Sequence, residues 1–185
     1  MASPGCLVLV VGPSGAGKDT LLRRAAAALR DEGRYCFVRR YITRPAGDPH
    51  EDHVALTEEE FAACKRAGRF SLSWRAHGFS YALPASVAEL IANRRIVAAN
   101  ASRTVVREAQ SRFARVGVIH VTASAEVLAR RIGDRGRETP KERTGRLARS
   151  VPEPAANGYV RTLVNEGPLE VVAGSFVGML RSFAA

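Results

Sequence analysis

The sequence has no long apolar run and only three cysteines. No stretch of its 185 residues approaches the 18 or more consecutive apolar residues that a membrane-spanning helix needs. Residues 1–5 carry no Lys or Arg ahead of the short apolar run that begins at Cys6, so we do not expect a secretory signal. Cys6, Cys36 and Cys64 form no CxxC pair and are too few for a disulfide framework. We therefore expect reduced thiols, no membrane span and a cytoplasmic location.

Lysine and acidic residues are also scarce. Only three of the 28 Lys and Arg residues are lysines, so 25 are arginines, and 18 Asp and Glu leave a net charge of +10. The guanidinium group suits bidentate contact with phosphate, which favours an anionic partner. Biased codon usage gives the same arginine excess, and charge alone does not separate a nucleotide from a nucleic acid. Because the basic residues carry no aromatic interleaving, we expect a small-molecule partner and no nucleic acid.

The order of expected elements predicts an α/β fold in a single domain, residues 1–185. With 46% hydrophobic and 25% charged residues, the chain can bury a core. Apolar strands are expected at 6–11, 36–38, 96–99, 116–121 and 162–164, and two further short strands at 70–74 and 79–83. Helices are expected at 20–29, about 57–67, about 104–113, 125–132, from 139 onwards and about 175–183. This alternation is typical of a parallel sheet flanked by helices.

A glycine-rich turn follows the first strand and opens the first helix, the context that a phosphate-binding loop requires. Its glycines let backbone N–H groups turn towards phosphate oxygens, the helix N-terminus adds positive potential, and Lys18 reaches the terminal phosphates. The motif predicts a P-loop NTPase fold and a bound nucleoside triphosphate, which the kinase resemblance described below implies is ATP. The residues expected to bind it here are Gly12, Pro13, Ser14, Gly15, Ala16, Gly17, Lys18, Asp19 and Thr20.

Asp19 stands where a P-loop normally has the Ser or Thr that ligates magnesium. Its carboxylate could bind Mg²⁺ directly, bind it through water, or only sit favourably at the helix N-terminus. No acidic residue ends the strand at 96–100 to serve as a second ligand. We therefore expect a largely hydrated Mg²⁺ carried by the nucleotide, with Asp19 as its candidate protein contact.

A phosphate loop alone fits kinases, GTPases and translocating ATPases. The guanine-reading Asn-Lys-x-Asp of GTPases is absent, and motor ATPases are usually larger. The chain has an inserted segment after the second strand and an arginine-rich segment near residue 140, which favour a phosphoryl transferase with two lids. We divide it into a core (1–41, 84–134 and 150–185), an acceptor-binding insertion at about 42–83 and an arginine-rich lid at about 135–149.

Several motifs follow one another in the order found in one branch of the kinases. They are Gly12 to Leu21, Thr43-Arg44-Pro45, His77-Gly78 with Tyr81, Arg135-Gly136-Arg137 and Val164-Asn165. In these the chain resembles the guanylate kinase branch of nucleoside-monophosphate kinases almost end to end. It departs from guanylate kinases at Arg75, where they carry a Glu. A guanidinium cannot accept hydrogen bonds from guanine, so the departure implies that guanine specificity is lost.

A second set of motifs resembles the ribose 1,5-bisphosphate phosphokinases of phosphonate catabolism. It comprises Gly17-Lys18-Asp19, Arg40 to Arg44, Asp52 to Leu56 with Glu60-Phe61, Leu72-Ser73-Trp74, Asn100 to Arg103, Arg135 to Glu138 and Arg146 to Arg149. Ala82 departs from the usual glycine. The resemblance implies ATP-dependent phosphorylation of ribose 1,5-bisphosphate on its 1-phosphate, giving 5-phosphoribosyl 1-diphosphate and ADP. A guanylate kinase or another nucleoside-monophosphate kinase is the alternative, and a basic nucleic-acid-binding ATPase is a remote one. The oligomeric state does not follow from the sequence.

The resemblance also implies roles for residues outside the phosphate loop. Arg40, Thr43 and Arg44, placed in the loop after the second strand, would bind the acceptor phosphate. His77 and Tyr81 would hydrogen-bond the sugar or its 5-phosphate, and Asn165 would lie beside the adenine. Arg135 and Arg146, with Arg137 and Arg149, would neutralise charge on the transferred group. Asn100, Ser102 and Arg103 follow a buried strand at its carboxyl end, where ligands of open α/β sheets bind, and are expected to contact the substrate.

Overall fold

The fold is that of a computed structural model, which describes residues 3–45, 52–133 and 159–184. Its main sheet has five parallel strands in the order β2-β7-β1-β8-β9. Their bounds are β1 Cys6–Val11, β2 Tyr35–Phe37, β7 Ile96–Asn100, β8 Val116–Thr122 and β9 Val160–Val164. The predicted parallel α/β sheet is confirmed.

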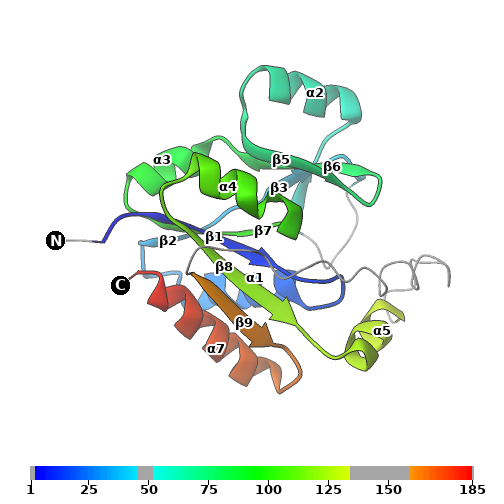
Figure 1. The fold of residues 1–185 in the computed structure, drawn as a ribbon, viewed down its shortest axis with the longest axis vertical. Helices are drawn as coiled ribbons and strands as arrows, with labels where there is room; N and C mark the ends of the chain where they lie inside the picture. Colours follow the sequence, from blue (N-terminus) through cyan, green and yellow to red (C-terminus); the bar gives the residue numbers. More distant parts are fainter. Residues whose placement is uncertain (1–2, 46–51, 134–158, 185) are drawn as a thin grey trace.

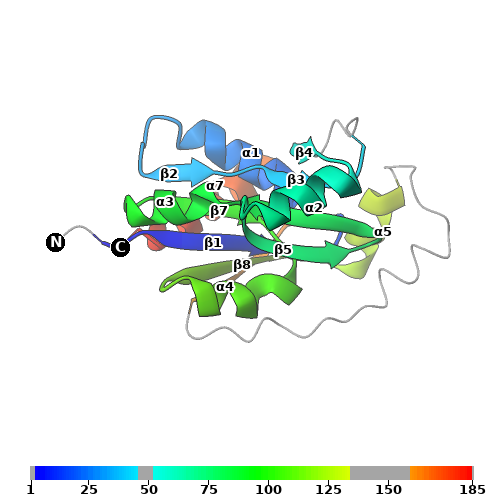
Figure 2. The ribbon, with the colours of Figure 1, turned by 90° about the horizontal axis from the view of Figure 1, so that it is seen from above.

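Helices cover both faces of this sheet (Figure 1), and Figure 2 shows α1 and α4 on opposite sides of it. Their bounds are α1 Lys18–Ala28, α3 Ser86–Ala92, α4 Val106–Arg112, α5 Ala125–Gly133 and α7 Leu169–Ser182; a short 3-10 turn, Arg103–Val105, precedes α4. No helix of the described residues is both long and apolar enough to span a bilayer.

Strand β1 is buried on both faces because it lies in the middle of the sheet. Cys6, Val8 and Val10 pack with α1 and α7 in one core cluster. Leu7 and Leu9 pack in a second cluster with α3 and α4 on the other face. This alternation explains why the strand reads as a continuous apolar run. Its carboxyl end, at the centre of the sheet, leads directly into the phosphate loop.

A second, four-stranded sheet stands beside the main one (Figure 1), in the order β4-β3-β6-β5. Its elements are β3 Arg40–Ile42, β4 His53–Ala55, α2 Glu58–Arg66, β5 Phe70–Ala76 and β6 Phe79–Pro84. Thr57 and Glu60 form the predicted capping box at the start of α2. His77 and Gly78, both with positive φ, form the two-residue turn between β5 and β6. We call this unit, residues 40–84, the second sheet.

Four elements differ from the expectations. β3, β4 and α3 are not among the elements expected from the sequence, and α7 begins six residues before the expected 175. Strands of three residues are too short to show an alternating pattern. In α7 two glycines, Gly174 and Gly178, weaken the helical pattern, yet Val172 and Ala173 at its start are buried against the core. The helix expected from 139 lies outside the described residues.

Candidate active site

The phosphate loop, residues 12–18, joins the end of β1 to the start of α1. Gly17 is the N-cap of α1 in the left-handed region, with φ +86°. The backbone angle favours glycine, and a Cβ atom there would lie 2.4 Å from Nδ2 of Asn165 and would displace that side chain. The first N–H groups of a helix have no helical partners, and Gly17 provides no side-chain cap, so this helix end is suited to bind an anion.

Lys18 folds back over the loop. Its ammonium group donates to the carbonyl oxygens of Gly12 at 2.9 Å and Pro13 at 2.8 Å. These bonds hold the cation at the mouth of the loop, where a bound polyphosphate would lie. Phosphate oxygens can exchange for the carbonyls at little cost, because both are hydrogen-bond acceptors and the phosphate carries more charge.

Asn165 supports the phosphate loop through two hydrogen bonds. Its side chain is buried, and Nδ2 donates to the carbonyl oxygen of Ala16 at 2.8 Å. Its backbone N–H donates to the carbonyl oxygen of Thr122 at 2.8 Å. The residue thereby ties the loop to the carboxyl ends of β8 and β9. Contact with adenine stays a prediction; the bond to Ala16 is a role that the sequence analysis missed, since only the fold brings residues 16 and 165 together.

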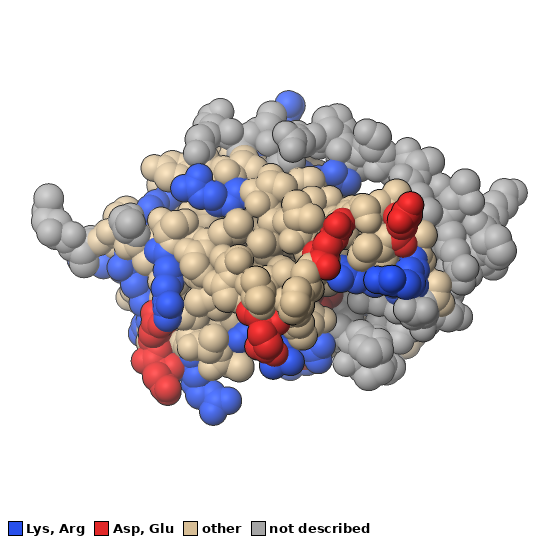
Figure 3. All heavy atoms as spheres, turned by 90° about the horizontal axis from the view of Figure 1, so that it is seen from below, with Lys and Arg blue, Asp and Glu red and all other residues tan. Residues whose placement is uncertain are grey.

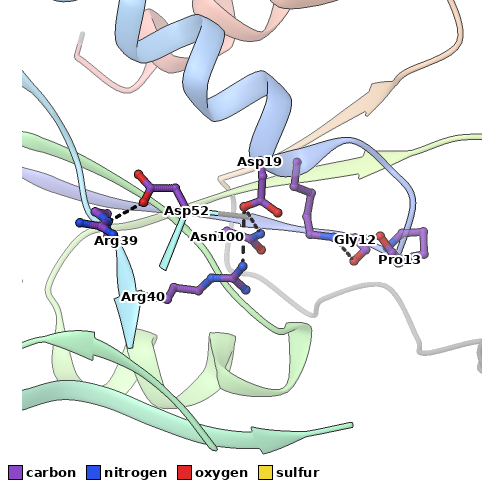
Figure 4. A network of polar contacts seen from close by, with 8 residues as sticks. Gly12, Pro13, Asp19, Arg39, Arg40, Asp52 and Asn100 are labelled. Atoms are coloured by element: carbon purple, nitrogen blue, oxygen red, sulfur yellow. Dashed lines mark hydrogen bonds and ion pairs between the residues drawn. The ribbon is translucent and has the colours of Figure 1, made fainter. Parts of the chain in front are cut away.

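Asp19, Asn100 and Arg40 converge beside the loop (Figure 4). Oδ1 of Asp19 accepts a hydrogen bond from Nδ2 of Asn100 at 2.7 Å and lies 3.6 Å from a terminal nitrogen of Arg40. Burial lowers the pKa of the Arg40 guanidinium, and the Asp19 carboxylate opposes that shift. The predicted placement of Arg40 in a loop is wrong: it belongs to β3, is only 8% exposed and points at Asp19.

Asp19 and Asn100, though not Arg40, offer oxygen ligands of the kind that a nucleotide-borne magnesium ion would need. The amide Oδ1 of Asn100 is buried and has no hydrogen-bond partner among the described residues, so a hard acceptor stands next to the Asp19 carboxylate. The described residues contain no group of three His, Cys, Asp or Glu able to hold a metal by themselves. One carboxylate and one amide oxygen suit Mg²⁺ that keeps its waters and phosphate ligands.

Arg44, Tyr81 and His77 lie on the second sheet, but in different settings. The Arg44 guanidinium lies 5.7 Å from the centre of the Phe79 ring. Tyr81 is buried, stacked on Trp74 with 5.6 Å between ring centres, and has the Arg40 guanidinium over its ring. His77 is exposed at the tip of the β5–β6 turn. Arg44 is half-buried, so it is more accessible than Tyr81 and less accessible than His77, and contact of these residues with a substrate stays a prediction. Tyr81 packs under the Arg40 guanidinium.

Thr43 is part of a polar cluster that the sequence analysis did not predict. Its hydroxyl donates to Oε1 of Glu58 at 2.7 Å and accepts from the N–H of Ser80 at 2.9 Å. The Ser80 hydroxyl also donates to Glu58, and Arg75 lies 3.9 Å from the same carboxylate. Glu58 thus links β3, β6 and the start of α2. In the sequence Glu58 is one of three acids that follow Thr57 at the start of α2, and no local pattern predicts its bonds to Thr43 and Ser80.

Ser102 and Arg103 follow β7 at its carboxyl end, as predicted. The Ser102 hydroxyl accepts from the N–H and the hydroxyl of Thr104, which caps the 3-10 turn. Burial lowers the pKa of the Arg103 guanidinium, which still remains a cation because arginine does not lose its proton in proteins. Ser102 therefore shapes this edge of the sheet, and Arg103 brings charge to it.

Relatives in sequence match the chain along nearly its whole length. It is 49% identical over 179 residues to the ribose 1,5-bisphosphate phosphokinase PhnN of Methylobacterium radiotolerans, covering 97% of this chain and 99% of the relative. It is 42% identical over 180 residues to PhnN of Brucella melitensis, covering 97% and 94%. The chain belongs to the ribose 1,5-bisphosphate phosphokinase family. A scan against protein-family models finds no match.

Other comparisons concern a longer relative and the fold. The chain is 41% identical over 184 residues to a bifunctional ribose 1,5-bisphosphokinase-thymidine phosphorylase of Cupriavidus pinatubonensis, where it spans 30% of the relative. A solved guanylate kinase of Anaplasma phagocytophilum superposes with TM-score 0.71 at 18% identity, covering 99% of this chain and 88% of that one. A gluconokinase of Sinorhizobium meliloti gives TM-score 0.57 at 20% identity, covering 100% and 95%. The expected P-loop NTPase fold is confirmed.

The catalytic arginines expected for a phosphokinase of this family are not among the described residues. Arg135 and Arg146, like Arg137 and Arg149, fall within 134–158. Of the predicted catalytic residues, the structure therefore describes Lys18.

Proposed function

We propose that the protein transfers the γ-phosphoryl group of ATP to the 1-phosphate of α-D-ribose 1,5-bisphosphate, giving 5-phosphoribosyl 1-diphosphate and ADP. The observation that carries the proposal is the full-length relationship to ribose 1,5-bisphosphate phosphokinases, at 49% and 42% identity to the two compared above. The phosphate loop at the end of β1, with Lys18 over it, supports ATP as the donor.

The acceptor oxygen needs no strong base. A phosphomonoester with a second pKa of about 6 is already largely dianionic at neutral pH. Its oxygen forms a new bond to the γ-phosphorus while the bond to the bridging oxygen of ADP breaks. Positioning and charge neutralisation then carry the catalysis.

The residues of the site divide between donor and acceptor. Lys18 and the N–H groups of the loop hold the terminal phosphates of ATP. Asp19 and Asn100 would hold Mg²⁺ or its waters, and the ion, when bound, would supply further positive charge to the phosphates. Arg44, on the second sheet, and Arg103, after the end of β7, would provide positive charge for the acceptor. Arg135 and Arg146 are proposed to neutralise the transferred group when the lids close and exclude water.

The structure of the product shows which phosphate of the acceptor receives the phosphoryl group. After incubation with ATP, Mg²⁺ and ribose 1,5-bisphosphate, ³¹P NMR should show a new pair of coupled diphosphate signals, and the 5-phosphate signal should persist. ADP should form in equal amount, and a control without the acceptor should give almost none. Release of ADP and inorganic phosphate with no diphosphate product would contradict the proposal.

Nucleic-acid binding has little support from the described surface. On the face that Figure 3 shows, Lys and Arg side chains are separated by uncharged surface, and several lie next to Asp or Glu. Arg112 pairs with Glu108 at 2.8 Å, and Arg24 pairs with Glu170 at 3.3 Å. A basic track for a phosphate backbone would need its cations clustered on one face or along one stripe. We therefore propose phosphate-bearing small molecules, rather than a nucleic acid, as the partners of the positive charge.

A further inference from the structure

We propose that Arg40 is a positioning residue: it neutralises and orients Asp19, and so permits an acidic side chain next to the polyphosphate of ATP. The inference rests on the proposed function in one respect, that the phosphate loop binds ATP. It replaces the expectation that Arg40 binds the acceptor phosphate.

The geometry of Asp19 supplies the first argument. Its side chain is 26% exposed and lies in the first turn of α1, next to Lys18 in sequence. Asn100 donates to Oδ1 at 2.7 Å, and the Arg40 guanidinium lies 3.6 Å from the same oxygen (Figure 4). The carboxylate is therefore held from two elements, β7 and β3, that belong to different sheets.

Charge supplies the second argument. A carboxylate in the first turn of a helix is favourable by itself, but beside the phosphates of ATP it adds repulsion between like charges. The side chain of Arg40 is only 10% exposed, so water screens its attraction for Asp19 weakly. A buried cation at this distance offsets the repulsion, and removing it leaves the carboxylate facing the phosphates with one counter-charge fewer.

The surroundings of Arg40 supply the third argument. Its guanidinium lies 5.8 Å from the centre of the Tyr81 ring, and that ring stacks on Trp74. Ile42 on β3 pairs with Tyr81 on β6, so this contact is fixed by the strand register. The guanidinium is thus held between a ring of the second sheet and the Asp19 carboxylate in the first turn of α1. Positioning Asp19, rather than free contact with an acceptor, is the role that this burial suits.

A neighbouring pair provides a matched control. Arg39 pairs with Asp52 at 2.7 Å, but both side chains are more than half exposed, at 55% and 61%. Figure 4 shows the two pairs together, the Asp52 pair turned away from the loop. Arg39→Met removes the same charge from the adjacent residue without touching Asp19.

The test is the dissociation constant of ATP, measured by calorimetry without acceptor and with EDTA, so that no magnesium contact of Asp19 contributes. Arg40→Met should raise Kd by about ten-fold or more, which corresponds to about 1.4 kcal/mol. Adding Asp19→Asn to that variant should restore Kd to within about three-fold of the wild type. Arg39→Met should leave Kd within about two-fold.

Three results would overturn the inference. The first is an unchanged Kd for ATP in Arg40→Met with a raised KM for ribose 1,5-bisphosphate, which would make Arg40 an acceptor ligand. The second is equal weakening in the single and double variants. If Arg40→Met does not fold, Asp19→Asn alone is decisive: Kd should stay equal or fall, and a rise above about five-fold contradicts the inference. Failure of the wild type to bind ATP would instead contradict the proposed function.

Discussion

Replacing Lys18 by alanine should lower kcat by about 10³-fold, because removing one preorganised charge from a developing transition state costs about 10² to 10³ in rate. The lysine is the one predicted catalytic residue that the structure describes, and it lies over the loop within 2.9 Å of two carbonyl oxygens. Steady-state rates of ADP release, at saturating ATP and acceptor, measure the effect.

The fold should survive this change. Lys18 is half-buried and contributes two bonds to loop carbonyls, which water can replace. We expect Tm to fall by only a few degrees. Lys65→Ala is the matched control, since Lys65 lies exposed on α2, and it should leave kcat unchanged. A kcat of Lys18→Ala within ten-fold of the wild type would show that Lys18 is not a catalytic residue.

Replacing Gly12 by alanine should have the largest effect on stability. Gly12 has φ +146°, and a Cβ there would lie 2.0 Å from the carbonyl oxygen of Val121. That oxygen belongs to β8, which is held between β1 and β9 and cannot move aside. Backbone strain costs about 1 to 3 kcal/mol and overpacking about as much again. We expect the free energy of unfolding to fall by about 2 to 6 kcal/mol, measured by urea denaturation.

Variants of two other glycines separate the cost of the backbone angle from the cost of the collision with Val121. Gly68 has φ +67° with open space around its Cβ position, so Gly68→Ala carries only the cost of the backbone angle, about 1 to 2 kcal/mol. Gly174 lies in α7 with open space and helical angles, so Gly174→Ala should raise stability by about 0.5 to 1 kcal/mol. If Gly12→Ala proved no more costly than Gly68→Ala, the predicted collision with Val121 would be wrong.

The parts of the fold with strong local signals could be predicted from sequence. β1 is a six-residue apolar run followed at once by the glycines of the phosphate loop, and Thr57 with Glu60 marks the start of α2. These signals depend on neighbouring residues only. β3 and β4 gave none, because each has three residues and begins with a buried polar side chain, Arg40 or His53, in place of an apolar one.

The candidate site could be predicted as a set of residues but not as a network. Gly12 to Thr20 follow from the loop motif, whereas the bond from Asn100 to Asp19 joins positions 81 residues apart. The bond from Asn165 to Ala16 spans 149 residues. Such contacts depend on the order of strands in the sheet, which no local pattern encodes. The same holds for Arg40, whose partner follows from where β3 stands relative to α1.

The choice of acceptor tests the central claim most directly. Initial rates of ADP release should be measured with ribose 1,5-bisphosphate and with GMP, each over a range of concentrations, with one enzyme preparation and saturating ATP and Mg²⁺. GMP is the appropriate competitor because a guanylate kinase shares the fold at TM-score 0.71. We predict that kcat/KM for ribose 1,5-bisphosphate exceeds that for GMP by at least about 10²-fold, the discrimination expected when a site lacks the polar partners of the wrong substrate. An equal or higher kcat/KM for GMP would contradict the account.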